Sequence, residues 1–212
     1  MTALYNPLAT ELARRYYAAY LGAAPKAAQR SALIAVVDLS QPVQAIKANI
    51  RKSYKSLINW GMRNLYIDTL DSANASRERF DTVREFHIAV AGRETRSAET
   101  WQIQADMIAA GEAFCTLAYL NARLVAANLI LLADAAYYGV GVYERELMAE
   151  GKPLAHAPLY CAILRAKRAG LKTFVLGEVD PSGEAKRDGI AHFKRGFATS
   201  TEPADWIDVE AA

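Results

Sequence analysis

The sequence predicts an α+β fold in which a mixed central sheet is flanked by helices. Apolar runs typical of strands alternate with segments whose apolar residues recur every three or four positions, as in helices. Three strand-like runs, Ala113–Leu120, Arg123–Ala133 and Ala136–Tyr143, are separated by two-residue turns, which favours antiparallel hairpins. A helix-like segment, Pro158–Gly170, then precedes the strand Lys172–Val179, and this order indicates a helical crossover to a parallel neighbour.

The elements before the hairpins follow from the same periodicities. A short helix over Pro7–Leu21 is expected to end at Gly22 and to lead into a loop that contains Pro25. The apolar stripe that begins at Val43 predicts one helix, started near Pro42 and running to Gly61. The remaining expected elements are the strands Ser31–Leu39 and Leu65–Leu70 and the helices Ser76–Ala91 and Ser97–Ala110.

After the hairpins we expect a polar loop over Glu144–His156. A polar helix or turn follows the late strand, and Ala204–Val209 is predicted to form an exposed edge strand that would support a homodimer. No repeat or linker divides the chain, so we interpret residues 1–30 as an N-terminal helix and loop and residues 31–212 as a single domain.

Composition and motif content exclude several classes of function. The 212 residues carry a net charge of +2, too small to indicate a general nucleic-acid binder. No apolar run has the length of a membrane helix and no signal-peptide core is seen, so we expect a cytoplasmic protein without membrane insertion. The chain contains no phosphate-binding GxxxxGK[ST], GxGxxG, HExxH, GxSxG or CxxC motif, and we expect no metal site.

The run Gly189–Phe197 combines glycine, aromatic residues and two cations, a mixture that core packing does not require. It resembles the C-terminal signature of the Fem-like branch of the GNAT acyltransferase superfamily. Two further segments are similar to that branch: Val37–Ser40 leading to Ile50–Ile58, as its basic opening helix, and Cys115–Ala127, as its central strand–turn–strand. The resemblance implies the GNAT (acyl-CoA N-acyltransferase) fold within the α+β class.

This chain also departs from the Fem-like pattern in two respects. Fem-type peptidoglycan enzymes carry two GNAT-like domains, whereas 212 residues hold one. The GNAT pyrophosphate loop R/Q-x-x-G-x-G/A is absent, because the segment before Pro158 reads MAEGKPLAH. The first departure argues against a tRNA-dependent peptidoglycan enzyme, and the second weakens the case for coenzyme A.

Candidate cofactor-binding residues lie on the third hairpin strand and at the start of the following helix. In a GNAT arrangement the donor lies along the strand that contains Gly139 and Gly141, where the absence of side chains permits close approach. The helix at Pro158 has no Ser, Thr, Asp or Asn directly before it, so its first N–H groups could hold a phosphate. Lys152 and His156 would assist, and Leu159 completes the set. The alternative for the two glycines is a bulge without a ligand, and the alternative for the helix start is solvation by water.

The resemblance implies that Lys194, in the matching Phe-Lys-x-Gly-Phe run, neutralises negative charge near the reacting atoms. Glu178 and Tyr160 are the predicted proton acceptor and donor. The predicted substrate-binding cations are Arg51, Lys55 and Arg195, which suit an anionic acceptor. The alternatives are a solvated basic surface for the cations, an ordinary surface carboxylate for Glu178 and a core position for Tyr160.

The leading hypothesis is an N-acyltransferase that moves an acyl group from acyl-CoA to an amine of a sugar, peptide or cell-envelope precursor. Acetyl-CoA is the leading candidate for the donor. A second hypothesis takes the acyl group from an aminoacyl-tRNA. The third is a catalytically silent GNAT-like module that binds a ligand or partner, and the missing pyrophosphate loop keeps it open.

Overall fold

The computed structural model describes residues 2–5 and 25–209, and the side chains from Ala32 to Ala204. The predicted helix Pro7–Leu21 lies outside the described residues. The chain divides into two compact units, one formed by residues 1–51, 133–138 and 166–212 and the other by residues 52–132 and 139–165. Two elements cross this division along the chain: β6 (Ala136–Tyr143) begins in the first unit, and α7 (His156–Arg168) ends there.

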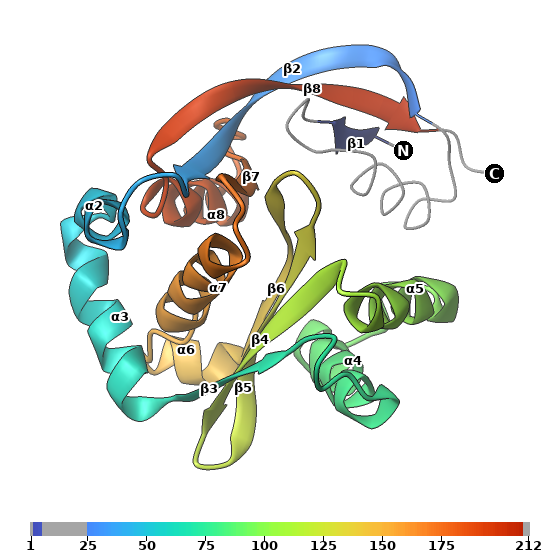
Figure 1. The fold of residues 1–212 in the computed structure, drawn as a ribbon, viewed down its shortest axis with the longest axis vertical. Coiled ribbons are helices and arrows are strands. Elements are labelled where there is room, and N and C mark those ends of the chain that lie inside the picture. The colour runs from blue at the N-terminus through green and yellow to red at the C-terminus, as the bar shows by residue number, and fades with distance from the viewer. Residues whose placement is uncertain (1, 6–24, 210–212) are drawn as a thin grey trace. The chain divides into compact units, whose positions relative to one another are not determined.

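The first unit is built on an antiparallel sheet with the strand order β1-β8-β2-β7 (Figure 1). Its strands are β1 (Thr2–Tyr5), β2 (Pro25–Asp38), β7 (Thr173–Glu178) and β8 (Ser200–Val209), and its helices are α2 (Val43–Asn49) and α8 (Ala185–Arg195). The first residues of β6 add a parallel strand beside β7, which confirms the predicted crossover. Buried aliphatic side chains, Ile34, Val36, Ala135, Val175 and Ala204, form a core on this sheet.

Two expectations for the first unit are wrong. Pro25 begins a strand instead of lying in a loop, because β2 extends over fourteen residues along β8. The segment Ala204–Val209 is not a sheet edge, since β8 pairs with β2 on one side and with β1 on the other. Its backbone groups are therefore engaged within the chain, and the proposed dimer edge loses its basis.

The second unit holds β3 (Tyr66–Leu70), β4 (Ala113–Leu120), β5 (Arg123–Leu132) and the remainder of β6. The predicted β4–β5 hairpin is confirmed, and β3 pairs antiparallel with β4. The helices of this unit are α3 (Lys52–Asn64), α4 (Arg77–Ala91), α5 (Ala98–Ala109), α6 (Arg145–Ala149) and most of α7. In Figure 1, α4 and α5 lie on one side of β3–β5, and α3, α6 and α7 lie on the other.

Local sequence signals explain where the two middle helices begin. Ser76 accepts a hydrogen bond from the backbone N–H of Arg79, and Ser97 accepts one from that of Thr100. A serine hydroxyl at this position satisfies an N–H group that has no partner within the helix. Gly92 ends α4 with a left-handed φ of 72°, and its N–H donates to the carbonyl of Ile88. Both helices are predicted correctly.

The single helix predicted from Val43 to Gly61 is two helices, α2 and α3. Ile50, between them, is extended, with φ −60° and ψ 134°, and its side chain is buried. The N–H of Arg51 donates to the carbonyl of Gly196, at 2.8 Å, instead of to the preceding helical turn. This contact with a segment far along the chain interrupts the helix. The expected loop Glu144–His156 is also partly helical, since it contains α6.

Among the described helices, none is both long and apolar enough to cross a membrane. In the same part of the chain no group of three or more His, Cys, Asp or Glu side chains is arranged to hold a metal ion.

Candidate functional site

The C-terminal end of β7 carries a bulge that the sequence analysis did not predict. Ala35 of β2 lies opposite Gly177, whereas the next β2 residue, Val36, lies opposite Val175, so Leu176 is the extra residue. Gly177 has a φ of 91°, a conformation that a residue with a Cβ adopts only under strain. The bulge therefore requires glycine at this position.

The Lys194 ammonium group lies over this bulge. Its Nζ donates to the carbonyl of Glu178 at 3.3 Å. A Cβ built on Gly177 would lie 3.0 Å from Lys194 Nζ and 3.7 Å from the hydroxyl of Tyr137. The missing side chain at Gly177 thus makes room for the lysine beside a tyrosine of the parallel strand β6.

Burial lowers the pKa of Lys194 from 10.5 to about 8, and Glu178 opposes this shift. Removing water from around an ammonium group destabilises its charged form, and a nearby carboxylate restores part of that stability. Lys194 is consequently still mostly protonated at pH 7 but close to the pH at which it can release a proton.

Residues Phe193–Phe197 span the end of α8, which closes at Arg195, and the two residues after it, and they fix the position of the two cations. The rings of Phe193 and Phe197 pack edge to face, with centroids 5.3 Å apart, and Phe197 is fully buried. Lys194 and Arg195 donate to successive carbonyls at the end of β7, those of Glu178 and Val179. The aromatic residues anchor the helix end, and the cations attach it to the strand.

This arrangement can perform two kinds of chemistry. A partly desolvated ammonium group stabilises an oxyanion or a phosphate more strongly than a solvated one does. A lysine whose pKa is near 8 can also accept or donate a proton close to neutral pH. Arg51 joins this region through its backbone bond to Gly196. The first unit therefore brings together four of the predicted site residues, namely Arg51, Glu178, Lys194 and Arg195.

The predicted cofactor residues at the start of α7 lie in the second unit. Lys152 forms an ion pair with Glu150. His156 packs edge to face on Tyr54, with ring centroids 4.5 Å apart, and burial lowers its pKa to about 4, so it is neutral at pH 7. Leu159 is completely buried.

The first turn of α7 is packed against α3 of the same unit. Ala157 is fully buried, and a Cβ built on Gly61 would overlap its Cβ. The start of the helix, expected from the sequence to hold a phosphate, is thus covered by protein at this point.

The other predicted site residues of the second unit lie on β6, α3 and α7. A Cβ on Gly139 would make only ordinary contacts, 3.6 Å from the carbonyl oxygen of Leu129, so packing does not demand glycine there. Gly141 is exposed, and Lys55 is half-buried on α3. Tyr160 is buried, and burial raises its pKa.

Sequence reasoning missed Gly177 and Tyr137. A glycine inside an apolar strand is itself a signal of a bulge or of a close approach, and this signal was available at Gly177. Tyr137 gave no comparable signal, because tyrosine is ordinary strand material.

No protein-family model and no curated protein matches the sequence. Solved structures do match the fold. FemX aligns with a TM-score of 0.63 and 13% identity over 84% of this chain and 62% of its own. L-PGS from Bacillus licheniformis aligns with a TM-score of 0.57 and 13% identity, over 86% of this chain and 62% of its own. The C-terminal domain of a putative lysylphosphatidylglycerol synthetase from Agrobacterium fabrum aligns with a TM-score of 0.56 and 14% identity, over 85% of this chain and 61% of its own.

This chain spans about three fifths of the length of each of these three chains. At such low identity the likeness concerns the fold alone. The predicted α+β fold, a mixed sheet flanked by helices, is confirmed, and it is shared with these three structures.

Proposed function

We propose that this protein is an acyltransferase that transfers an activated acyl group to an amine of a sugar, peptide or cell-envelope precursor. The observation that carries the proposal is the placement of Lys194 over the bulge at Gly177, with its pKa near 8. Attack of an amine on an ester or thioester carbonyl produces an oxyanion and releases a proton. A half-buried lysine supports either event. The similarity in fold to FemX and to the C-terminal domain of a putative lysylphosphatidylglycerol synthetase is consistent with this class of reaction.

The proposed donor is acyl-CoA, with acetyl-CoA as the first compound to test. Gly139 and Gly141 on β6 would lie along the donor, Tyr160 would protonate the leaving group and Glu178 would accept the proton of the amine. Arg51, Lys55 and Arg195 would bind an anionic acceptor. Lys152 and His156 are the residues proposed to contact the donor's phosphates.

An aminoacyl-tRNA is the second proposed donor, and the surroundings of α7 are the reason to test it. Lys152 is already paired with Glu150, His156 is neutral at pH 7, and the first turn of α7 is covered at Ala157. These contacts weaken the coenzyme A phosphate site without affecting Lys194. Binding of tRNA would weaken steeply as salt is raised, because each phosphate contact releases counterions.

The test compares both donors in one set of acceptors. Release of free thiol from acetyl-CoA is followed with glucosamine and with a lysine-containing peptide, and transfer from radiolabelled aminoacyl-tRNA is followed in parallel. Lys194→Met should lower kcat by roughly 100-fold or more, the loss that follows removal of one oxyanion-stabilising donor. Lys186→Met, at an exposed lysine of the same helix, should leave kcat unchanged.

Circular dichroism of each variant separates loss of activity from loss of folding. A folded Lys194→Met protein with wild-type kcat would overturn the assignment of this lysine. Binding of acetyl-CoA without turnover in any acceptor would instead support the third hypothesis, a silent binding module.

A further inference from the structure

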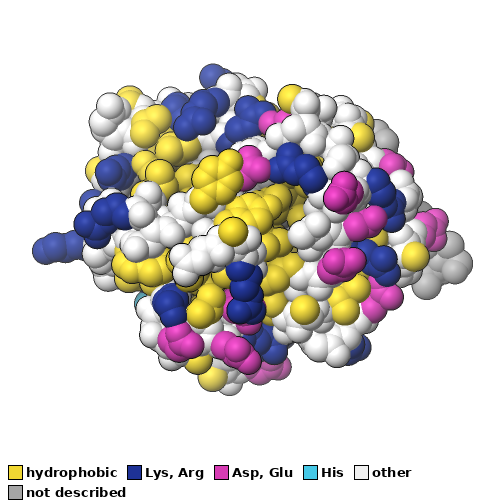
Figure 2. Space-filling view, turned by 90° about the horizontal axis from the view of Figure 1, so that it is seen from below, with side chains coloured by type: hydrophobic (Ala, Val, Ile, Leu, Met, Phe, Trp, Pro, Cys, Tyr) yellow, Lys and Arg dark blue, Asp and Glu magenta, His cyan; other side chains and the backbone are white. Residues whose placement is uncertain are grey.

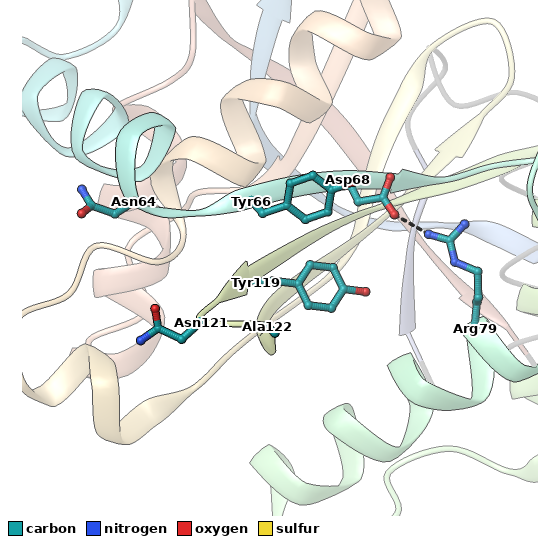
Figure 3. Close-up of a pocket in the computed structure, with 7 residues that line it drawn as sticks. All are labelled: Asn64, Tyr66, Asp68, Arg79, Tyr119, Asn121 and Ala122. Atoms are coloured by element: carbon teal, nitrogen blue, oxygen red, sulfur yellow. Dashed lines mark hydrogen bonds and ion pairs between the residues drawn. The ribbon is translucent and has the colours of Figure 1, made fainter.

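A surface pocket of about 650 Å³ lies in the second unit, at the ends of β3 and β4 and beside the β4–β5 turn (Figure 3). All of its lining residues belong to that unit. Its volume falls within the range of roughly 300–1,000 Å³ that is typical of small-molecule sites. None of the residues assigned above to acyl transfer contributes to its lining.

Two tyrosine rings form one wall of the pocket. Tyr66 of β3 and Tyr119 of β4 are directly opposite in the antiparallel register, so their side chains emerge on the same face. Their ring centroids are 6.1 Å apart and the rings are tilted by 40°, so they lie beside each other as a platform and do not enclose a slot. Tyr66 is 69% exposed, an unusual position for so large an apolar surface.

Polar groups lie at both ends of this platform (Figure 3). At one end Arg79 of α4 forms an ion pair with Asp68 of β3, at 2.5 Å. At the other end are Asn64 and Asn121. The amide nitrogen of Asn64 donates to the carbonyl of Trp60 at 2.7 Å, so the amide oxygen is the group of this side chain that can accept a hydrogen bond from a ligand.

The β4–β5 turn holds the pocket open on the side of Asn121. Asn121 and Ala122 have φ values of 52° and 63°, as in the tight hairpin turns whose two central residues are both left-handed. The small side chain of Ala122 leaves space beside the rings. Seen from the side of this turn, the surface shows apolar side chains surrounded by cations and carboxylates (Figure 2).

The charge of the pocket argues against an anionic ligand. Among the described lining residues Arg79 is the one cation, and it is paired with Asp68. A neutral ligand with an apolar face and several hydroxyl groups fits better, since the rings can cover the face while amide, carboxylate and guanidinium groups bind hydroxyls at the rim. Neither tyrosine hydroxyl makes a hydrogen bond within the described part of the chain, so both are available to such a ligand.

We propose that the pocket at Tyr66 and Tyr119 binds a neutral saccharide, stacked on the two rings and held by Asp68, Arg79 and the two asparagines. A nucleoside is the competing occupant, because a base also stacks on tyrosine. The tilted, side-by-side rings favour the saccharide, since they present a broad open surface with hydrogen-bonding groups at both ends.

Saturation-transfer NMR and titration calorimetry on the full chain test the proposal with maltotriose, cellotriose and chitotriose, and with adenosine and uridine as the competing class. We expect binding of at least one trisaccharide, weakened about tenfold or more by Tyr66→Ala. Tyr66→Phe should keep most of the affinity because it preserves the ring. Met62→Ala, at an exposed α3 residue outside the lining, is the matched control and should bind as wild type does.

Binding should also survive Lys194→Met, so a failure of the proposed acyl transfer leaves this result intact. Because Tyr66 is exposed, its substitution should not prevent folding, and a thermal melt checks this. The absence of trisaccharide binding, equal affinity in Tyr66→Ala and wild type, or binding of nucleosides alone would each overturn the proposal.

Discussion

Replacement of Gly177 by alanine tests the geometry of the lysine site directly. The φ of 91° is strained for any residue with a Cβ, and a backbone outlier of this kind costs about 1–3 kcal/mol. The added Cβ would also lie 3.0 Å from Lys194 Nζ. Since that atom is the far end of a flexible side chain, the lysine should move away from the bulge and become more solvated.

Gly183→Ala provides the matched control. Gly183 belongs to the same unit and has a φ of 74°, but a Cβ there meets no atom within 4 Å. Both variants should therefore lose a similar free energy of unfolding, measured by urea denaturation. Only Gly177→Ala should raise the pKa of Lys194 from about 8 towards 10.5.

The pKa is measured by NMR titration of protein labelled with ¹³C at lysine Cε, with Lys194→Met used to assign the resonance. Activity towards the best donor should fall about tenfold or more in Gly177→Ala and stay near wild type in Gly183→Ala. If the pKa of Lys194 and the activity were the same in both glycine variants, the argument that Gly177 makes room for this lysine would be refuted.

Three further perturbations test other parts of the structure. The free energy of unfolding should rise by up to about 3 kcal/mol between pH 8 and 10.5, because in this window Lys194 keeps its proton in the unfolded chain and has released it in the folded protein. Urea denaturation at a series of pH values measures this rise, and Lys194→Met should abolish it. Gly61→Ala should destabilise by about 1–3 kcal/mol through overlap with the Ala157 methyl group, and the double variant with Ala157→Gly should recover stability in thermal melts, whereas simple addition of the two single losses would contradict the overlap. Asn128→Ala should cost about 1–3 kcal/mol, because Asn128 is fully buried and its amide binds Thr116 and the hydroxyl of Tyr143 at 3.1 and 2.6 Å; a double-mutant cycle with Tyr143→Phe should show coupling, and strict additivity would exclude the network.

The parts of the fold that were predicted correctly depend on local signals. The hairpin of β4 and β5 follows from two apolar runs that meet at a two-residue turn, and α4 and α5 follow from local periodicity, which the structure supplements with a serine cap before each helix. These preferences act within a few residues, so one sequence is enough to identify them.

The errors arise where distant segments decide the local structure. The apolar stripe continues through Ile50, but the helix breaks there because the N–H of Arg51 bonds to Gly196, 145 positions further along the sequence. Likewise, Pro25 lies in a strand because β8 pairs with it through Val209. Neither contact leaves a mark in the local periodicity.

The candidate site combines both kinds of information. The resemblance in Phe193–Phe197 pointed to Lys194, but only the structure connects it with the bulge at Gly177 and with Tyr137. The proposed donor residues Gly139 and Tyr160 were inferred by position in a fold, and their roles stay predictions.

The two cations at the end of α8 differ in a way that their adjacency in the sequence conceals. Both donate to carbonyls of β7, yet the side chain of Arg195 is exposed, whereas that of Lys194 is half-buried over a glycine that leaves space for it. An exposed guanidinium is well suited to attach a helix end to a strand, since it keeps its charge under all conditions. A desolvated ammonium group with a pKa near 8 is less stable than one exposed to water. Stabilisation of a negative charge that develops during a reaction would explain why the fold retains it. In the proposed reaction this difference favours Lys194 as the cation at the reacting atoms, and it leaves Arg195, at the exposed end of the helix, for the proposed contact with an anionic acceptor.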